Sequence, residues 1–208
     1  VMELSNAKFS EGMNTSQYVD SIKVNKEPFL DIYSATQIPE TVQNFFDTPG
    51  QTINLAVFTS DWCGDAMSTT PAILKLADST NNINLEIFNR DDELELANSF
   101  LPENRAGTTP IFVVLDKDMR QISRFIETAN SLVPRIDAMD EQISKEVSGE
   151  GDNARTAGRG KRTAFRVSHA GEWSNIILEE FTNVVSEGLQ LPLDQRPTQG
   201  GTKWPPES

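Results

Sequence analysis

The stretch from Ile53 to Pro71 constrains the fold of this chain more than any other. It opens with an apolar run, Ile53–Phe58, whose length and composition are typical of a buried strand. Cap-type residues at positions 59–61 follow, and they predict that a helix begins near Cys63. The only cysteine of the 208-residue chain therefore lies where a strand ends and a helix begins. Because a helix N-terminus offers partial positive charge and free N–H groups to a thiolate, Cys63 is a candidate reactive residue.

The residues around this cysteine resemble the active-site loop of thioredoxins. The segment Trp62–Ala66 matches the W-C-G-x-C motif of that family, except that Ala66 stands at the second cysteine. Pro71 falls eight residues after Cys63, where thioredoxins place a helix-kinking proline. Thr108–Pro110 resembles the cis-proline loop of the family. These three landmarks occur in the order that the family shows.

The resemblance covers residues 52–133 and is closest to a bacterial branch of thioredoxin-like proteins. In this branch Asp65 follows the tryptophan–cysteine pair, and segments like Asn89–Asp91 and Thr109–Phe112 occur further along the chain. A helical N-terminal segment precedes the fold in the same branch. The resemblance therefore implies an α/β thioredoxin fold, a central mixed sheet flanked by helices, with an added N-terminal helical segment and a C-terminal extension.

Periodicity and turn residues divide the chain into three parts. Residues 1–50 are expected to form a helical segment packed on the core, residues 51–148 a thioredoxin-like domain, and residues 149–208 an extension. The elements expected in the first two parts are helices within Met13–Ile22, around Phe29–Tyr33 and over Glu40–Phe46, strand Ile53–Thr59, helix Cys63–Asp78, strand Leu85–Asn89, helix Asp92–Phe100, a hairpin of Ile111–Leu115 and Gln121–Ile126, and a helix carrying Leu132 to Ile143.

The extension has a different character. Glycine, alanine and polar residues over Gly149–Gly160 favour a loop or linker. A helix is expected over Trp173–Val185, and the proline-containing tail Leu189–Ser208 is expected to hold no regular element. A basic cluster stands out in this otherwise acidic chain, and its members are Arg155, Arg159, Lys161, Arg162 and Arg166. It is interpreted as a solvated loop, with binding of an anionic partner or of the acidic body of the same chain as the alternative.

The resemblance implies thiol–disulfide exchange, but without the usual resolving thiol. Ala66 cannot release a mixed disulfide, so an external thiol must do so. Thioredoxins also carry a buried aspartate six residues before the first cysteine, where this chain has Val57, and Ile87 appears at the place of the neighbouring lysine. That pair assists proton transfer in the dithiol cycle. The prediction is therefore single-thiol exchange, with Cys63 as the catalytic residue and Asp65 opposing thiolate formation by its like charge.

The resemblance also implies a substrate-binding groove around the sulfur, formed by Trp62, Gly64, Asp65, Thr109 and Pro110. The backbone at Thr109 could pair with an extended peptide there, and such a groove could bind without any redox step. A non-catalytic protein- or peptide-binding module is therefore the alternative function. A thiol peroxidase is disfavoured, because the threonine and arginine expected near a peroxidatic cysteine are not evident. The expected partner is a protein or a low-molecular-weight thiol or disulfide.

Composition and motifs exclude several other classes. A net charge of −13 argues against general nucleic-acid binding. No apolar run approaches the ~18 residues of a membrane span, and the polar start of the chain shows no signal peptide, so a cytoplasmic location without membrane contact is expected. A single cysteine excludes an intramolecular disulfide and a zinc–thiolate cluster within one chain. No cofactor is implied.

Two further sets of residues could suggest other sites. The acidic run of Asp91, Asp92, Glu93 and Glu95 could suggest a metal site, but it fits better as the acidic first turn of a helix, so no metal is expected. His169 is the only histidine. A lone histidine in a polar loop is more often incidental than catalytic, which leaves a Cys63–His169 dyad as the alternative.

Overall fold

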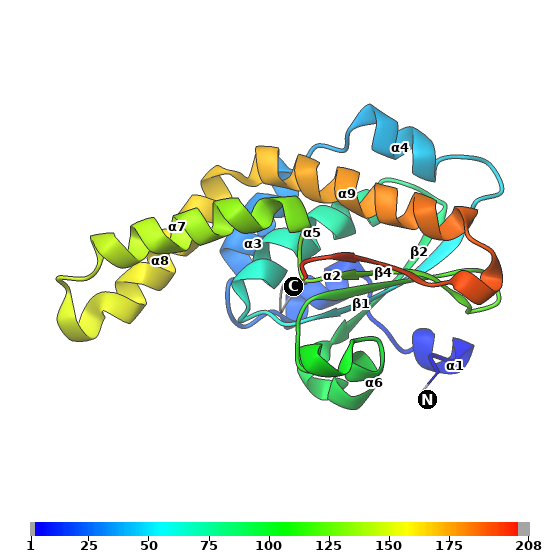
Figure 1. Ribbon diagram of the computed structural model, residues 1–208, viewed down its shortest axis with the longest axis horizontal. Helices are drawn as coiled ribbons and strands as arrows, with labels where there is room; N and C mark the ends of the chain where they lie inside the picture. The colour runs from blue at the N-terminus through cyan, green and yellow to red at the C-terminus, as the bar shows by residue number, and fades with distance from the viewer. Residues whose placement is uncertain (1–2, 204–208) are drawn as a thin grey trace.

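A computed structural model describes residues 3–203 and shows a mixed sheet with helices on both faces (Figure 1). The strands are β1 (Ile53–Thr59), β2 (Ile83–Asn89), β3 (Ile111–Leu115), β4 (Gln121–Ile126) and β5 (Thr198–Gly201). Their order across the sheet is β2-β1-β3-β4-β5. The pairs β1–β2 and β4–β5 are parallel, whereas β3 runs antiparallel to both of its neighbours. The predicted α/β thioredoxin fold is confirmed.

Strand β1 lies inside the sheet and is buried along its whole length. Leu55 and Val57 point into the larger core cluster, and Ala56 and Phe58 point into the smaller one on the opposite face. A mainly apolar run, interrupted here only by Asn54, is what a strand covered on both faces requires. This covered strand fixes the position of the loop that follows it, where Cys63 lies.

The helices divide between the two faces of the sheet. The larger cluster contains buried side chains from α2 (Thr15–Ser21), α3 (Lys26–Ala35), α4 (Glu40–Phe46), α5 (Gly64–Asp78), α7 (Val133–Glu146) and α9 (Ala170–Gln190). The smaller cluster contains side chains from α1 (Asn6–Phe9) and α6 (Leu94–Ser99). Single-turn 3₁₀ helices lie in the connections: η1 (Arg90–Asp92), η2 (Glu103–Arg105), η3 (Asn130–Leu132), η4 (Gly151–Asn153) and η5 (Leu193–Gln195).

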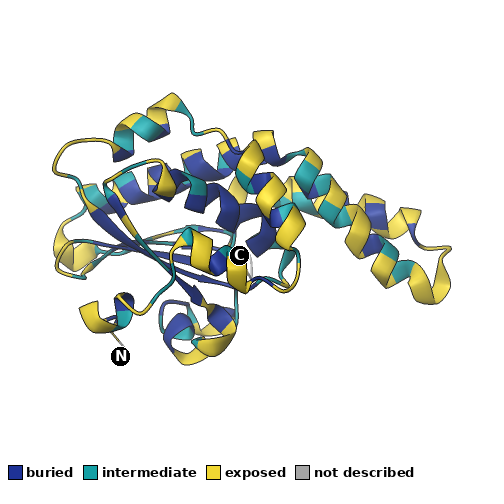
Figure 2. Cartoon of the chain, turned by 180° about the vertical axis from the view of Figure 1, so that it is seen from behind, coloured by how far each residue is buried: buried dark blue, intermediate teal, exposed yellow. Residues whose placement is uncertain are grey.

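Helix α8 (Ala154–Ser168) corrects the prediction of a loop over Gly149–Gly160. It packs against α7, and the two form a hairpin that projects from the body of the molecule and is largely exposed (Figures 1 and 2). Phe165 packs against the core from the inner end of α8, while Gly158 is buried beside Val147 near the outer end. Tertiary contact with α7 thus overrides the low helix propensity of the glycines.

The C-terminal tail also differs from its prediction. The tail was expected to lack regular structure, yet Thr198–Gly201 forms β5 beside β4. Its glycines allow this close packing: a Cβ at Gly200 would lie 2.2 Å from Val184 of α9, and one at Gly201 would lie 2.1 Å from the carbonyl oxygen of Ile126. The remainder of the predicted tail, after residue 203, lies outside the described residues. Helix α9 is also longer than the predicted Trp173–Val185.

None of the helices within residues 3–203 is both long enough and apolar enough to cross a membrane.

Candidate functional site

Cys63 occupies the N-cap position of α5, four residues after the end of β1. Its backbone is extended, with φ −87° and ψ 130°, and its carbonyl accepts the first helical hydrogen bond from Met67 N at 2.9 Å. Pro71 lies inside the same helix. The sequence therefore places the sulfur at a helix start, as predicted, because the buried strand and the helix leave only a short loop between them.

The sulfur lies beside the second landmark of the sequence. Cys63 Sγ donates to the carbonyl oxygen of Thr109 at 3.6 Å, and the Thr109–Pro110 peptide bond is cis. Thr109 and Pro110 are buried, and the Thr109 hydroxyl lies 3.2 Å from that of Ser60, in the loop between β1 and α5. Cys63 is only partly buried. The fold thus brings residues 46 positions apart into contact at a sulfur that is not enclosed by the core.

Burial is the main influence on the Cys63 thiol and raises its pKa. Backbone N–H groups of Ala66 and Asp65 act in the opposite direction by bonding the sulfur, while the negative charges of Asp65 and Glu127 raise the pKa further. The net pKa lies above the usual range, so at neutral pH the thiol is the main form. The helix start contributes as predicted, but desolvation and like charge outweigh it.

Arg166, from α8, meets the first turn of α5. Its Nη2 lies 3.1 Å from Asp65 Oδ1, an ion pair without hydrogen-bond geometry, and its Nη1 donates to Ser68 Oγ at 2.8 Å. The Arg166 side chain is only 8% exposed. An arginine from the extension therefore neutralises part of the negative charge next to the sulfur.

A second charged pair, Arg105 and Glu127, lies close to Asp65. Arg105 Nη2 lies 2.9 Å from Glu127 Oε2, and Arg105 Nη1 donates to the carbonyl oxygen of Thr202 at 2.7 Å. Burial raises the pKa of Glu127, and the charge of Asp65 adds to the effect. These residues join the end of β5 to the site, and no local sequence signal identified them.

Trp62 is held by the Asn89–Asp91 segment. Its side chain is 54% exposed, its Nε1 donates to Asp91 Oδ2 at 2.8 Å, and the Arg90 guanidinium lies over its ring at 5.6 Å. Arg90 Nη2 in turn lies 3.1 Å from Asp91 Oδ1. The second motif of the sequence thus orients an exposed aromatic ring next to Cys63.

A groove of about 600 Å³ opens beside the sulfur. It is lined by Val24, Asn25, Trp62, Cys63, Gly64, Asp65, Met67, Asp140, Arg155, Arg159, Arg162, Thr163 and Arg166. Four of the six predicted site residues are in this lining, whereas Thr109 and Pro110 are not.

The Asp61 carboxylate accepts from the backbone N–H groups of Lys23 and Val24, at 2.9 and 3.1 Å, which holds the N-terminal segment against the loop. In the sequence the arginines that line the groove are interpreted as a solvated loop, with binding of an anionic partner or of the acidic body of the chain as the alternative. In the structure Arg166 and Arg162 pair with Asp65 and Asp140, which agrees with the last of these.

The two thioredoxin positions that this chain has lost lie together in the structure. Val57 and Ile87 are paired across β1 and β2, and both are fully buried. Ala66, at the position of the second cysteine, is 2% exposed. The site therefore has an apolar pair in place of the acid–base pair that serves the dithiol cycle.

His169 lies in a different environment from Cys63. Its Nδ1 is 2.8 Å from the carbonyl oxygen of Phe165, and its ring stacks on that of Phe165 at 4.0 Å. It is not among the residues that line the groove. Nothing in these contacts supports a Cys63–His169 dyad. Within residues 3–203, no three histidine, cysteine, aspartate or glutamate side chains gather into a potential metal site.

Comparison with known proteins agrees with this architecture. A protein of unknown function from Pseudomonas aeruginosa superposes with a TM-score of 0.62 at 17% identity, covering 89% of this chain and 98% of that one. A crystal structure of an HIV epitope scaffold gives a TM-score of 0.49 at 18% identity, over 80% of this chain and 94% of that one. No curated protein matches significantly.

The family comparison is more informative. A family model described as thioredoxin matches residues 12–140. This region includes β1, the Cys63 loop, the Thr109–Pro110 turn and most of the N-terminal helices. It makes up more than half of the sequence, so the chain belongs to the thioredoxin family.

Proposed function

We propose that this protein carries out thiol–disulfide exchange through Cys63 alone, with an external thiol as the resolving group. The observation that carries the proposal is the position of the sulfur, at the start of α5, partly exposed and lining an open groove. A structural cysteine would be expected within the apolar core, where no disulfide could reach it.

The exchange has two balanced steps. The Cys63 thiolate attacks one sulfur of a disulfide, a Cys63–substrate disulfide forms, and the other half leaves as a thiolate that takes a proton from solvent. An external thiolate then attacks the substrate sulfur of this mixed disulfide, which joins the substrate half to the external thiol in a new disulfide and returns Cys63 as a thiolate. No electrons are gained or lost by the protein over the cycle. The external thiol is needed because position 66 is alanine.

The backbone supports this chemistry more than the side chains do. N–H groups of Asp65 and Ala66 bond the sulfur and stabilise its anion, both when it attacks and when it leaves. Because burial and the nearby carboxylates keep the pKa of the thiol raised, the exchange should be slow at neutral pH and accelerate as the pH rises.

A binding module without redox activity is the second candidate. The raised pKa of Cys63 favours it, because it lowers the fraction of reactive thiolate, and the apolar pair Val57–Ile87 offers no acid–base group to the sulfur. This binding module can be tested with a peptide that is selected from a displayed library for binding to the wild-type protein. The peptide should still bind to Cys63→Ser but should no longer bind to Trp62→Ala. Loss of the peptide from Cys63→Ser would count against it.

The proposed exchange can be tested by mass spectrometry of the folded protein. Reduced protein is mixed with oxidised glutathione, and the intact mass is recorded before and after addition of 2-mercaptoethanol. We expect one glutathionyl group on Cys63, its release by the added thiol, and no adduct on Cys63→Ser. Failure of the folded protein to form the adduct, while the urea-unfolded protein forms it completely, would overturn the proposal.

A further inference from the structure

One face of α8 is lined with arginines. Arg155, Arg159, Arg162 and Arg166 follow one another at intervals of four, three and four residues, so they share one side of the helix. All four line the groove that also contains Cys63. This face belongs to the α7–α8 hairpin, which projects from the body of the molecule (Figure 1). It lies outside residues 52–133, which carry the resemblance to thioredoxins, so the motifs of that family do not explain it.

The charges of this face are only partly compensated within the protein. Arg166 pairs with Asp65 at 3.1 Å, and Arg162 Nε donates to Asp140 Oδ1 at 2.9 Å. Arg155 and Arg159 are exposed, and neither side chain has an ion pair or hydrogen bond within the described part of the chain. Four guanidinium groups against two carboxylates leave the lining of the groove with two excess positive charges.

This excess is unusual in a chain whose net charge is −13. A large acidic partner, such as a nucleic acid or an acidic protein, would be repelled by the rest of the surface. A small anion that enters the groove meets mainly the local arginines, and the volume of about 600 Å³ is typical of sites for small molecules. The size of the groove and the distribution of charge therefore both favour a small ligand.

The chemistry of the lining specifies the ligand further. Guanidinium groups bind carboxylates with paired, directed hydrogen bonds. The sulfur in the same groove requires that the ligand also carry a thiol or a disulfide. We propose that the groove binds a low-molecular-weight thiol or disulfide bearing at least two carboxylates, with Arg155 and Arg159 holding the carboxylates while the ligand sulfur meets Cys63. This inference rests on the proposed function, because it names the substrate class of the same sulfur.

In the exchange step with such a ligand, Cys63 Sγ forms a bond to one sulfur of the small disulfide, and the disulfide bond of the ligand breaks. The departing half leaves as a carboxylate-bearing thiolate and takes a proton from solvent. The arginines take no part in bond making, so they are binding residues and should change affinity for the ligand rather than the chemistry of the sulfur.

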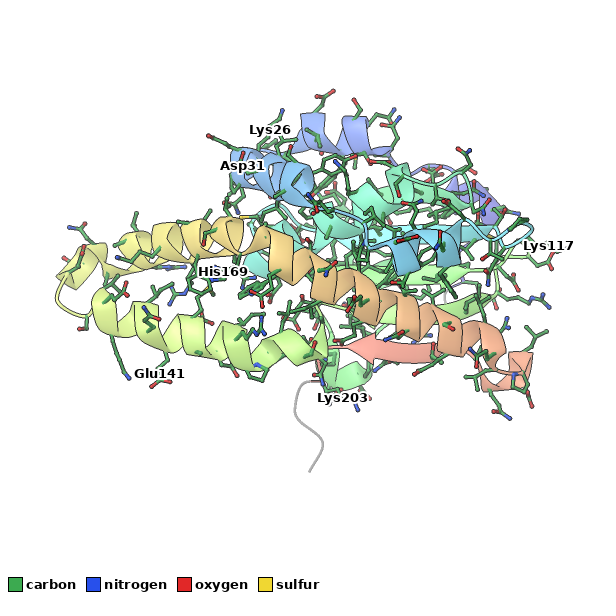
Figure 3. All side chains as sticks on the ribbon, turned by 90° about the horizontal axis from the view of Figure 1, so that it is seen from above. Lys26, Asp31, Lys117, Glu141, His169 and Lys203 are labelled. Atoms are coloured by element: carbon green, nitrogen blue, oxygen red, sulfur yellow. The ribbon has the colours of Figure 1, made fainter. Side chains whose placement is uncertain are left out.

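Binding can be measured without exchange in the Cys63→Ser protein, with oxidised glutathione as the probe and titration calorimetry as the readout. The test variant adds Arg155→Gln and Arg159→Gln. A control adds Lys117→Gln, which removes one positive charge in the turn between β3 and β4, at the far end of the molecule from the α7–α8 hairpin (Figure 3). Both arginines are exposed, so the variant should fold, and a thermal melt checks this.

We expect saturable binding of oxidised glutathione to Cys63→Ser, at least tenfold weaker after the two arginine substitutions and unchanged after Lys117→Gln. Neutral 2-hydroxyethyl disulfide should not bind. Absence of binding, or equal weakening by the arginine and lysine substitutions, would overturn the inference. So would an acidic cysteine peptide that binds Cys63→Ser more tightly than oxidised glutathione does, because it would indicate a macromolecular partner.

The outcome also separates this inference from the proposed function. If wild type forms adducts with neutral and anionic disulfides at equal rates, and the arginine substitutions change neither rate, exchange stands and the anionic ligand is wrong. If Cys63→Ser binds oxidised glutathione through the arginines but wild type forms no adduct, the groove stands and exchange is wrong.

Discussion

Replacing Asp65 by asparagine tests how charge controls the sulfur. Asp65 raises the pKa of Cys63 by its negative charge, and Arg166 at 3.1 Å offsets part of that charge. A like charge nearby disfavours the thiolate, so we expect Asp65→Asn to lower the pKa of Cys63. The guanidinium released from its ion pair acts in the same direction.

The rate change is smaller than the change in thiolate fraction. Well below the pKa, a lower pKa increases the fraction of thiolate, but a less basic thiolate attacks disulfides more slowly, with a Brønsted coefficient of about 0.4–0.5. Each tenfold gain in thiolate is therefore expected to raise the rate at pH 7 by only about threefold. Above both pKa values only the loss of nucleophilicity remains, so wild type should be faster there, and the two pH–rate profiles should cross.

The assay is the second-order reaction of Cys63 with neutral 2-hydroxyethyl disulfide between pH 6 and pH 10, which avoids any effect of ligand charge. Asp118→Asn, in the exposed hairpin turn, removes the same charge away from the site and should leave the wild-type profile unchanged. A profile for Asp65→Asn that coincides with wild type, or that moves to higher pH, would refute the electrostatic account of Cys63.

Two further predictions follow from the packing around the site and the sheet. Ala66→Cys restores a second thiol one helical turn from Cys63, so a disulfide should form between the two on oxidation. The disulfide would be seen as a loss of 2 Da in intact mass and as resistance to alkylation. Full alkylation of both cysteines after oxidation would contradict this prediction. Gly188→Ala places a Cβ 2.3 Å from the carbonyl oxygen of Ile122, so the free energy of unfolding in urea should fall by about 1–3 kcal/mol. Gly160→Ala, with open space around it in α8, should raise that free energy by up to about 1 kcal/mol; equal effects of the two substitutions would count against the close packing of α9 on β4.

Local pattern was sufficient for much of the fold. The bounds of β1, β3, β4 and α4 agree with the sequence prediction, because each is set by an apolar run or by punctuating residues such as Pro39 and Pro49. The contact between Cys63 and Thr109 was implied by the order of the family motifs. In these cases the local signal and the tertiary structure agree.

The errors arose where tertiary contact decides the structure. The glycines around residues 149–160 favour a loop by composition, but α7 supplies a surface on which α8 can pack. Gly200 and Gly201 look like linker residues, yet they form a strand because only glycine fits between α9 and β4. The ion pair of Arg166 with Asp65 joins residues 101 positions apart, and no local pattern predicts such a contact. The groove that the arginines of α8 form with Cys63 depends on the same tertiary contacts, and the sequence offered binding of an anionic partner only as the alternative.

Catalytic turnover tests the central claim most directly. The substrate is a peptide carrying one cysteine in mixed disulfide with glutathione, and the rate of its reduction by excess glutathione is followed with and without protein. Exchange through Cys63 predicts a rate proportional to protein concentration, several turnovers per chain, and a return to the uncatalysed rate for Cys63→Ser. Equal rates for wild type, Cys63→Ser and buffer would contradict the account.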